Sequence, residues 1–222
     1  MPAIAITGGV ATGKSTFCHY LRELLRQARF FDADQAARQI VDLAHIKNAV
    51  RKEFGAEMFS GSGELNRAAV RAIILRDAAK RRALEQILHP PIRAQWSALA
   101  ETHRNSPDFF FADIPLLYET GGEILCDRVV VVACSRSVQV ERLRARGSGN
   151  VAQLFKLRSG ERQVENLFDQ PEAEAMINSQ MPLEEKIKRA DHVVWNNNGP
   201  DVLRVQTKLL VDLWRTEKWT KP

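Results

Sequence analysis

The chain has 222 residues, of which 45% are hydrophobic and 27% are charged, and its formal net charge is +5. This size and balance are typical of one soluble globular unit with a substantial core. No apolar run approaches the roughly 20 residues that span a bilayer, and no basic segment precedes the first apolar run. We therefore expect a cytoplasmic protein with no membrane partner. The 3 cysteines are scattered without a C-x-x-C spacing, which argues against a disulfide framework and a zinc site.

A short apolar run leads directly into a glycine-rich motif. Residues 3–7 read AIAIT, which favours a strand buried on both faces of a parallel sheet. Residues 8–15 read GGVATGKS and match G-x-x-x-x-G-K-[ST], the phosphate-binding loop. Its backbone N–H groups cradle phosphates, its lysine reaches the β- and γ-phosphates, and its hydroxyl ligates Mg²⁺. The motif predicts a nucleoside triphosphate and Mg²⁺ as ligands, bound by Gly8, Gly9, Val10, Ala11, Thr12, Gly13, Lys14, Ser15 and Thr16.

Strand-like runs then alternate with helical patterns. A helix is expected after the loop, from the spacing of Phe17, Leu21 and Leu24. Further strands are expected at 28–31, 109–112, 128–133 and 192–195. This order predicts an α/β fold of three layers, a mainly parallel five-stranded sheet with helices on both faces, as in P-loop NTPases.

Three carboxylates follow predicted strands. Asp32 and Asp34 end the second strand and Asp113 ends the third, and ligands of such sheets bind beyond these strand ends. If the chain stays extended, Asp32 and Asp34 project the same way; one then orients Mg²⁺ or the loop, and the other accepts the proton of an acceptor hydroxyl. A helix cap is an equal alternative for Asp32. The predicted metal-site residues are Ser15, Asp32 and Asp113.

The connection between the second and third strands is longer than a crossover needs. Within residues 60–106, the stretch from Asn66 to about Arg104 is helical in pattern, and His89-Pro90-Pro91 is expected to interrupt that helix. We interpret this stretch as a helical insertion that binds the substrate.

The segment around 147–170 is polar and carries Arg158 and Arg162. Beside a nucleotide site, such a long loop predicts a lid that closes over phosphates, with a disordered insertion as the alternative. Arg142 and Arg146, which follow the fourth strand, are candidates for clamping the transferring phosphate. Asp113 begins the sequence D-I-P-L rather than D-x-x-G, and no N-K-x-D motif occurs, which argues against a regulatory GTPase.

Several motifs in one order resemble the dephospho-CoA kinase family over nearly the whole chain. They are the phosphate loop, Asp32-Ala33-Asp34, Leu88-His89-Pro90, Pro115-Leu116-Leu117-Tyr118-Glu119, Gln180 to Lys186, and Asn197-Asn198-Gly199. The resemblance implies a single kinase domain over 1–222, divided by function. Its parts are a nucleotide-binding core (1–42, 107–146 and 188–222), a helical CoA-binding insertion (60–106) and a lid region (147–187) with an extra basic insertion.

The resemblance implies that ATP phosphorylates the ribose 3′-hydroxyl of dephospho-CoA, with Mg²⁺, to give coenzyme A. It implies Asp34 as the general base beside the catalytic residues Lys14 and Arg142, with Arg142, Arg146 and Asn198 near ATP. It implies substrate contacts at Asp34, Arg38, Arg67, His89, Pro115, Leu116, Leu117 and Glu119. A monomer is expected, and nucleic acid is not an expected partner.

Two positions depart from the family pattern. Ala11 stands where a glycine is usual, and Met176 stands where an arginine is usual. Arg158 or Arg162 is our hypothesis for a replacement cation. Three alternatives stay open: a P-loop kinase with a nucleoside or nucleotide acceptor, a nucleotide-dependent regulatory protein whose basic insertion holds nucleic acid or a partner, and a kinase inactivated by its lid.

Overall fold

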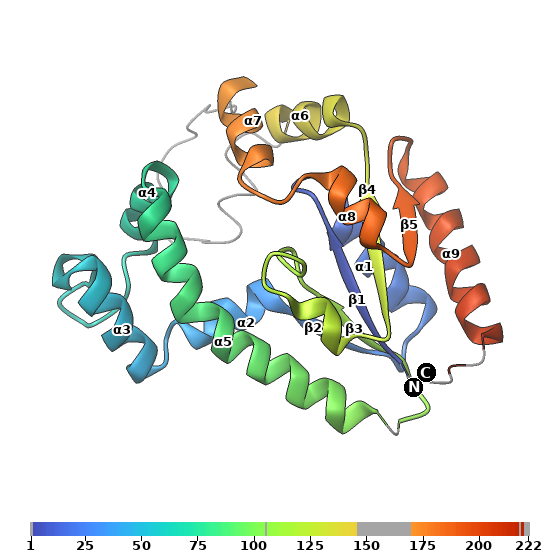
Figure 1. Cartoon of the computed structure of the whole chain (residues 1–222), viewed down its shortest axis with the longest axis horizontal. Coiled ribbons are helices and arrows are strands. Elements are labelled where there is room, and N and C mark those ends of the chain that lie inside the picture. The colour runs from blue at the N-terminus through green and yellow to red at the C-terminus, as the bar shows by residue number, and fades with distance from the viewer. Residues whose placement is uncertain (1, 105, 146–169, 218, 220–222) are drawn as a thin grey trace.

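The computed structural model of the chain describes residues 2–104, 106–145, 170–217 and 219 (Figure 1). Its sheet has five strands in the order β2-β3-β1-β4-β5, and every neighbouring pair is parallel. The strands are β1 (Ala3–Gly8), β2 (Arg29–Asp32), β3 (Phe110–Asp113), β4 (Arg128–Ala133) and β5 (His192–Trp195). The predicted α/β, P-loop type of fold is confirmed, with each strand within a residue or two of its predicted place.

Helices cover both faces of the sheet, because the strands are apolar on both sides (Figure 1). Ile4 and Ile6 of β1 pack with α1 and α9 on one face, whereas Ala5 faces α2, α3, α5 and α8. The helices are α1 (Lys14–Leu24), α2 (Ala33–Ile40), α3 (Ala44–Phe54), α4 (Arg67–Arg76), α5 (Ala78–His103), α6 (Arg136–Ala145), α7 (Gln170–Asn178), α8 (Leu183–Arg189) and α9 (Pro200–Thr216), with short 3₁₀ turns η1 (Ala56–Met58) and η2 (Gly122–Leu125).

The prediction that His89-Pro90-Pro91 interrupts the helical insertion is wrong. Helix α5 runs through both prolines, although a proline removes a backbone donor and crowds the preceding turn. The helix continues because its apolar side chains, among them Leu88 and Ile92, pack against the core cluster that contains the buried Trp96. Burial of this face outweighs the backbone bonds that the prolines forgo.

Two further expectations are tested by the described residues. None of their helices is both long and apolar enough to cross a membrane. The cysteines at 18, 126 and 134 are free thiols, and Cys18 and Cys134 are buried, as the scattered spacing predicts.

Candidate active site

The phosphate loop joins β1 to α1 through two residues with left-handed backbone. Gly13 has φ of 95°, and a Cβ built on it would lie 2.0 Å from Asn196 Nδ2, so only glycine fits there. Ala11 also has a positive φ, 59°, which is uncommon for a residue with a side chain. The structure thus places a strained alanine where the loop turns, and its methyl group is buried.

Side chains from distant segments hold the tip of this loop. Gln139 Nε2 of α6 donates to the Val10 carbonyl at 2.7 Å, and the Val10 N–H donates to Gln180 Oε1 at 3.1 Å. Both backbone groups of one loop residue are therefore fixed by glutamines that lie before α8 and within α6. The loop is braced from outside, which leaves its concave side to phosphates.

Arg142 and Asn196 brace the other end of the loop. Arg142 Nη2 donates to the Asn196 carbonyl at 2.8 Å, and its Nη1 lies 3.3 Å from the Thr12 carbonyl. Asn196 Nδ2 in turn donates to the Thr12 carbonyl at 2.8 Å. The predicted nucleotide residue Asn198 lies nearby, exposed in the connection from β5 to α9.

Lys14, the motif lysine, pairs with Asp113 at the end of β3. Burial disfavours the charged form of Lys14, but the Asp113 carboxylate outweighs it, and the pKa of Lys14 is raised. Cys18 Sγ lies 3.5 Å from the second Asp113 oxygen, and burial raises the pKa of this thiol. Lys14 is therefore a fixed positive charge at the mouth of the loop. Ser15 and Thr16 follow it, exposed at the start of α1.

Asp32 ends β2 with extended backbone, but the chain does not stay extended as far as Asp34, because α2 begins between them at Ala33. The condition under which the two side chains would project the same way is therefore not met. Asp32 caps that helix and accepts the Gln35 N–H at 2.9 Å. Asp34 lies in the first turn and lines the neighbouring cavity. Burial raises the pKa of Asp34, the Lys14 charge opposes this, and Asp32 and Asp113 add to it. A carboxylate with a raised pKa is a stronger proton acceptor.

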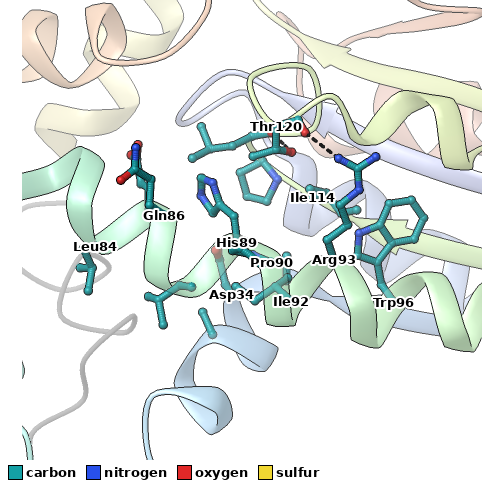
Figure 2. Close-up of a pocket in the computed structure, with 16 residues that line it drawn as sticks. Asp34, Leu84, Gln86, His89, Pro90, Ile92, Arg93, Trp96, Ile114 and Thr120 are labelled. Carbon is teal, nitrogen blue, oxygen red and sulfur yellow. Dashed lines mark hydrogen bonds between the residues drawn. The ribbon is translucent and has the colours of Figure 1, made fainter. Parts of the chain in front are cut away.

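A cavity of about 580 Å³ opens beside Asp34 (Figure 2). It is formed by α2, α5 and the segment after β3, and most of its surface is apolar. Its lining residues are Ala33, Asp34, Ala37, Leu84, Glu85, Gln86, Leu88, His89, Pro90, Ile92, Arg93, Trp96, Ile114, Pro115, Leu116 and Thr120. Asp34 therefore lies between the phosphate loop and a cavity large enough for a small organic ligand.

His89 and Arg93 lie one turn apart on α5 and face this cavity (Figure 2). Arg93 Nη1 donates to the Thr120 carbonyl at 3.2 Å. Burial lowers the pKa of His89, although Glu85 and Glu119 act in the opposite direction. Near pH 7 the imidazole is therefore neutral and offers a hydrogen bond rather than a charge.

The other predicted substrate residues take different positions. Pro115 and Leu116 line the cavity with His89, whereas Leu117 is fully buried in the core. Arg67 Nη2 donates to the Arg38 carbonyl at 3.1 Å and pairs with Asp42 at 3.2 Å, so it fastens α4 to the end of α2. Arg38 itself is exposed one turn after Asp34.

Helices α6 and α7 meet over the tip of the phosphate loop. Ala11, Leu143 and Ala173 form a small buried cluster, and Met176 packs against it. The two departures from the family pattern, Ala11 and Met176, thus share one apolar cluster. Arg146, Arg158 and Arg162 lie outside the described residues.

The donor set at this sheet edge fits Mg²⁺ that arrives with a nucleotide. The Ser15 hydroxyl and the carboxylates of Asp32 and Asp113 are hard oxygen donors, and the two aspartates are register partners on β2 and β3. Among the described residues no group of three or more His, Cys, Asp or Glu side chains could hold a metal. Mg²⁺ commonly needs only one or two carboxylates, because phosphates and water complete its shell.

Comparisons with known proteins agree with this arrangement. A family model described as dephospho-CoA kinase matches residues 2–167. The chain belongs to the dephospho-CoA kinase family. The dephospho-CoA kinase of Anaeromyxobacter dehalogenans is 40% identical over 217 residues, covering 96% of this chain and 92% of that protein. The chain is thus an enzyme of a kinase family.

Solved structures share the fold. TT1252 from Thermus thermophilus has a TM-score of 0.71 at 28% identity and covers 97% of this chain and 98% of its own. Dephospho-CoA kinase from Campylobacter jejuni has a TM-score of 0.64 at 23% identity, with 95% of each chain covered.

Reasoning from the sequence missed several residues of this dephospho-CoA kinase family site. Arg93 faces the cavity one turn after His89, a spacing that was visible in the helical pattern. Asn196, rather than Asn198, contacts the phosphate loop. Gln180 and Lys186 entered only through the resemblance. Their contacts with distant backbone, like that of Gln139, carry no local signal.

Proposed function

We propose that the chain transfers the γ-phosphate of ATP to the ribose 3′-hydroxyl of dephospho-CoA, giving coenzyme A. The position of Asp34 carries this proposal, because its carboxylate lies at the junction of the phosphate loop and the apolar cavity. Phosphoryl transfer needs a held donor, an oriented hydroxyl and neutralised charge. These three requirements correspond to the loop, the cavity with Asp34, and the cations Lys14 and Arg142.

In this mechanism the backbone of the loop binds the phosphates of ATP. The 3′-hydroxyl oxygen forms a bond to the γ-phosphorus while Asp34 accepts the hydroxyl proton. In the same step the bond between the γ-phosphorus and ADP breaks. Lys14 and Arg142 stabilise the negative charge of the transferring group. Ser15 with Asp113 or Asp32 would hold Mg²⁺, which supplies charge neutralisation at the β- and γ-phosphates.

The acceptor cavity carries a candidate anchor for the diphosphate of dephospho-CoA. Among the described residues that line it, Arg93 has the only lysine or arginine side chain. Its guanidinium has five donors, and the bond to the Thr120 carbonyl uses one of them. We assign the remaining donors to the acceptor diphosphate, since guanidinium groups bind phosphate oxygens in pairs.

An acceptor-dependent turnover assay tests the proposed reaction. ADP release from ATP with Mg²⁺ is measured in the presence of dephospho-CoA, in the presence of adenosine, and without an acceptor. The mass of the product is determined by mass spectrometry. We expect release that requires dephospho-CoA, a product heavier by one phosphate, and loss of both in Asp34→Asn. Asp212→Asn, which changes an exposed carboxylate on α9, should keep the rate. Turnover that prefers adenosine or ignores the acceptor would contradict the proposed function.

A further inference from the structure

Lys186 is a buried cation that the proposed chemistry does not use. It lies on α8 and is 0% exposed. Its ammonium group lies 2.8 Å from Glu119 Oε1, 2.9 Å from the Pro115 carbonyl and 3.4 Å from the Gly8 carbonyl. An ammonium group has three hydrogens, and here they meet three acceptors from separate parts of the chain.

These acceptors belong to the two halves of the proposed reaction site. Gly8 ends β1 and is the first glycine of the phosphate loop. Pro115 lines the acceptor cavity, and its carbonyl also accepts the Thr7 hydroxyl at 3.0 Å. Glu119 accepts the Met181 N–H at 2.9 Å, which ties the segment after β3 to the segment entering α8. One side chain therefore links the donor loop, the acceptor wall and α8.

Holding three segments together with a buried charge costs free energy, because the charged group loses its hydration. An apolar side chain of similar volume often gives equal or greater stability than a buried ion pair. Two charged groups act on Lys186 in the described structure: Glu119 from the segment after β3 and Lys14 from α1. Burial lowers the pKa of Lys186, Glu119 raises it, and Lys14 lowers it further. Lys186 thus places a buried ammonium group near a second cation, Lys14, although an apolar side chain there could stabilise the fold equally well.

We propose that Lys186 is a positioning residue that sets the phosphate loop against the acceptor wall, so that the γ-phosphate and the acceptor hydroxyl meet in line. This inference rests on the proposed phosphoryl transfer. Reacting atoms must approach to roughly 3–3.5 Å, and a displacement of about 1 Å can slow a reaction about 100-fold. Lys186 touches neither ligand in this arrangement and acts through Gly8 and Pro115.

Steady-state kinetics of Lys186→Met separate positioning from binding. We expect kcat to fall about 10- to 100-fold while KM for ATP and for dephospho-CoA stays within about 3-fold, because each half-site remains intact. Lys188→Met is the matched control, since Lys188 is exposed on the same helix and pairs only with its neighbour Glu185 among the described residues. It should behave as the wild type. Unchanged kcat in folded Lys186→Met, even with a lower Tm, would overturn the proposal.

The pH profile of Glu119→Gln provides a second and independent readout. The glutamine oxygen still accepts a hydrogen bond but no longer favours the charged form of Lys186. The fall of kcat at alkaline pH should therefore move to lower pH than in the wild type. An unshifted profile would overturn the proposal, and this variant decides alone if Lys186→Met does not fold. A wild type that fails to phosphorylate dephospho-CoA would instead overturn the proposed function, and this inference with it.

Discussion

The phosphate loop and the acceptor cavity are built in opposite ways. The loop is held through its backbone, with Gln139, Gln180 and Asn196 fixing individual carbonyl and N–H groups. The cavity is an apolar surface collected from α2, α5 and the segment after β3, with a few polar groups such as Asp34 and Arg93. In the proposed function, the loop is a rigid binding site for the phosphates of ATP, and the cavity is shaped for one acceptor.

This contrast explains why the two halves fail differently under mutation. Changes in the loop should act on charge and on the chemical step, whereas changes in the cavity should act on acceptor affinity. Asp34 lines the cavity and also lies near Lys14 of the loop, so its substitution should affect both parts of the site.

Asp34→Asn should have the largest effect, lowering kcat about 10²- to 10⁴-fold by removing the proton acceptor. Because the pKa of Asp34 is raised, wild-type kcat should fall on the acid side at a higher pH than for an ordinary aspartate. A raised folded-state pKa gives stability below the unfolded-state pKa that is lost as pH rises through the folded value. The variant should therefore have a higher Tm near pH 7. Lower activity with a lower Tm would indicate damage to the fold instead.

Lys14→Met should have the next largest effect and lower kcat about 100- to 1,000-fold. The variant lacks the ammonium group that stabilises the negative charge of the transferring phosphate. The affinity for dephospho-CoA should stay at the wild-type value. Rapid-mixing kinetics and acceptor titration check the two halves of this prediction. A large loss of acceptor affinity would show that the loop and the cavity are not separate.

Arg93→Ala should raise KM for dephospho-CoA by about 10- to 100-fold, the cost of a charged hydrogen bond of 1.5–3 kcal/mol. KM for ATP should not change. Arg82→Ala, at an exposed position on the same helix, serves as the control. If Arg93→Ala keeps the wild-type KM for dephospho-CoA, the diphosphate is bound elsewhere.

Gln139→Ala should raise KM for ATP by about 3- to 10-fold, because one buried hydrogen bond to the loop is lost. Gln206→Ala serves as the control, since Gln206 also bonds backbone groups through its side-chain amide, but those of Trp195 rather than those of a loop residue. Equal effects of the two variants on KM for ATP would mean that the brace on Val10 does not matter.

Ala11→Gly should have the smallest effect. Relief of the left-handed strain, about 1–2 kcal/mol, is offset by loss of a buried methyl group and by the freer unfolded chain. Tm, measured by calorimetry, should stay within about 4 °C of the wild type. Ala11→Val should lower Tm clearly, because a β-branched residue at this φ is strained further. A stable Ala11→Val protein would contradict the observed backbone of the loop.

The contrast also separates what could be predicted from the sequence. The strands, the parallel sheet between two layers of helices, and the phosphate loop follow from local patterns. These predictions are confirmed. Of the two roles left open for Asp32, the structure shows the helix cap, because α2 begins at the next residue. The predicted proline break in α5 was wrong, because core packing overrides a local penalty.

The remaining site residues depend on contacts between distant segments. Lys186 meets Gly8 across 178 positions of sequence, and Asn196 meets Thr12 across 184. No local periodicity encodes such a contact, because it depends on how the β-strands and helices are arranged in space. The roles assigned to Asp34, Arg93 and Arg142 therefore stay predictions until they are measured.

Calorimetric titration of the two ligands tests the separation of the two halves most directly. A non-hydrolysable ATP analogue with Mg²⁺ and, separately, dephospho-CoA are titrated into the wild type, Lys14→Met and Arg93→Ala. We expect Lys14→Met to weaken only the nucleotide and Arg93→Ala to weaken only dephospho-CoA. If either variant weakens both ligands equally, or if dephospho-CoA does not bind the wild type, the two-part site described above is contradicted.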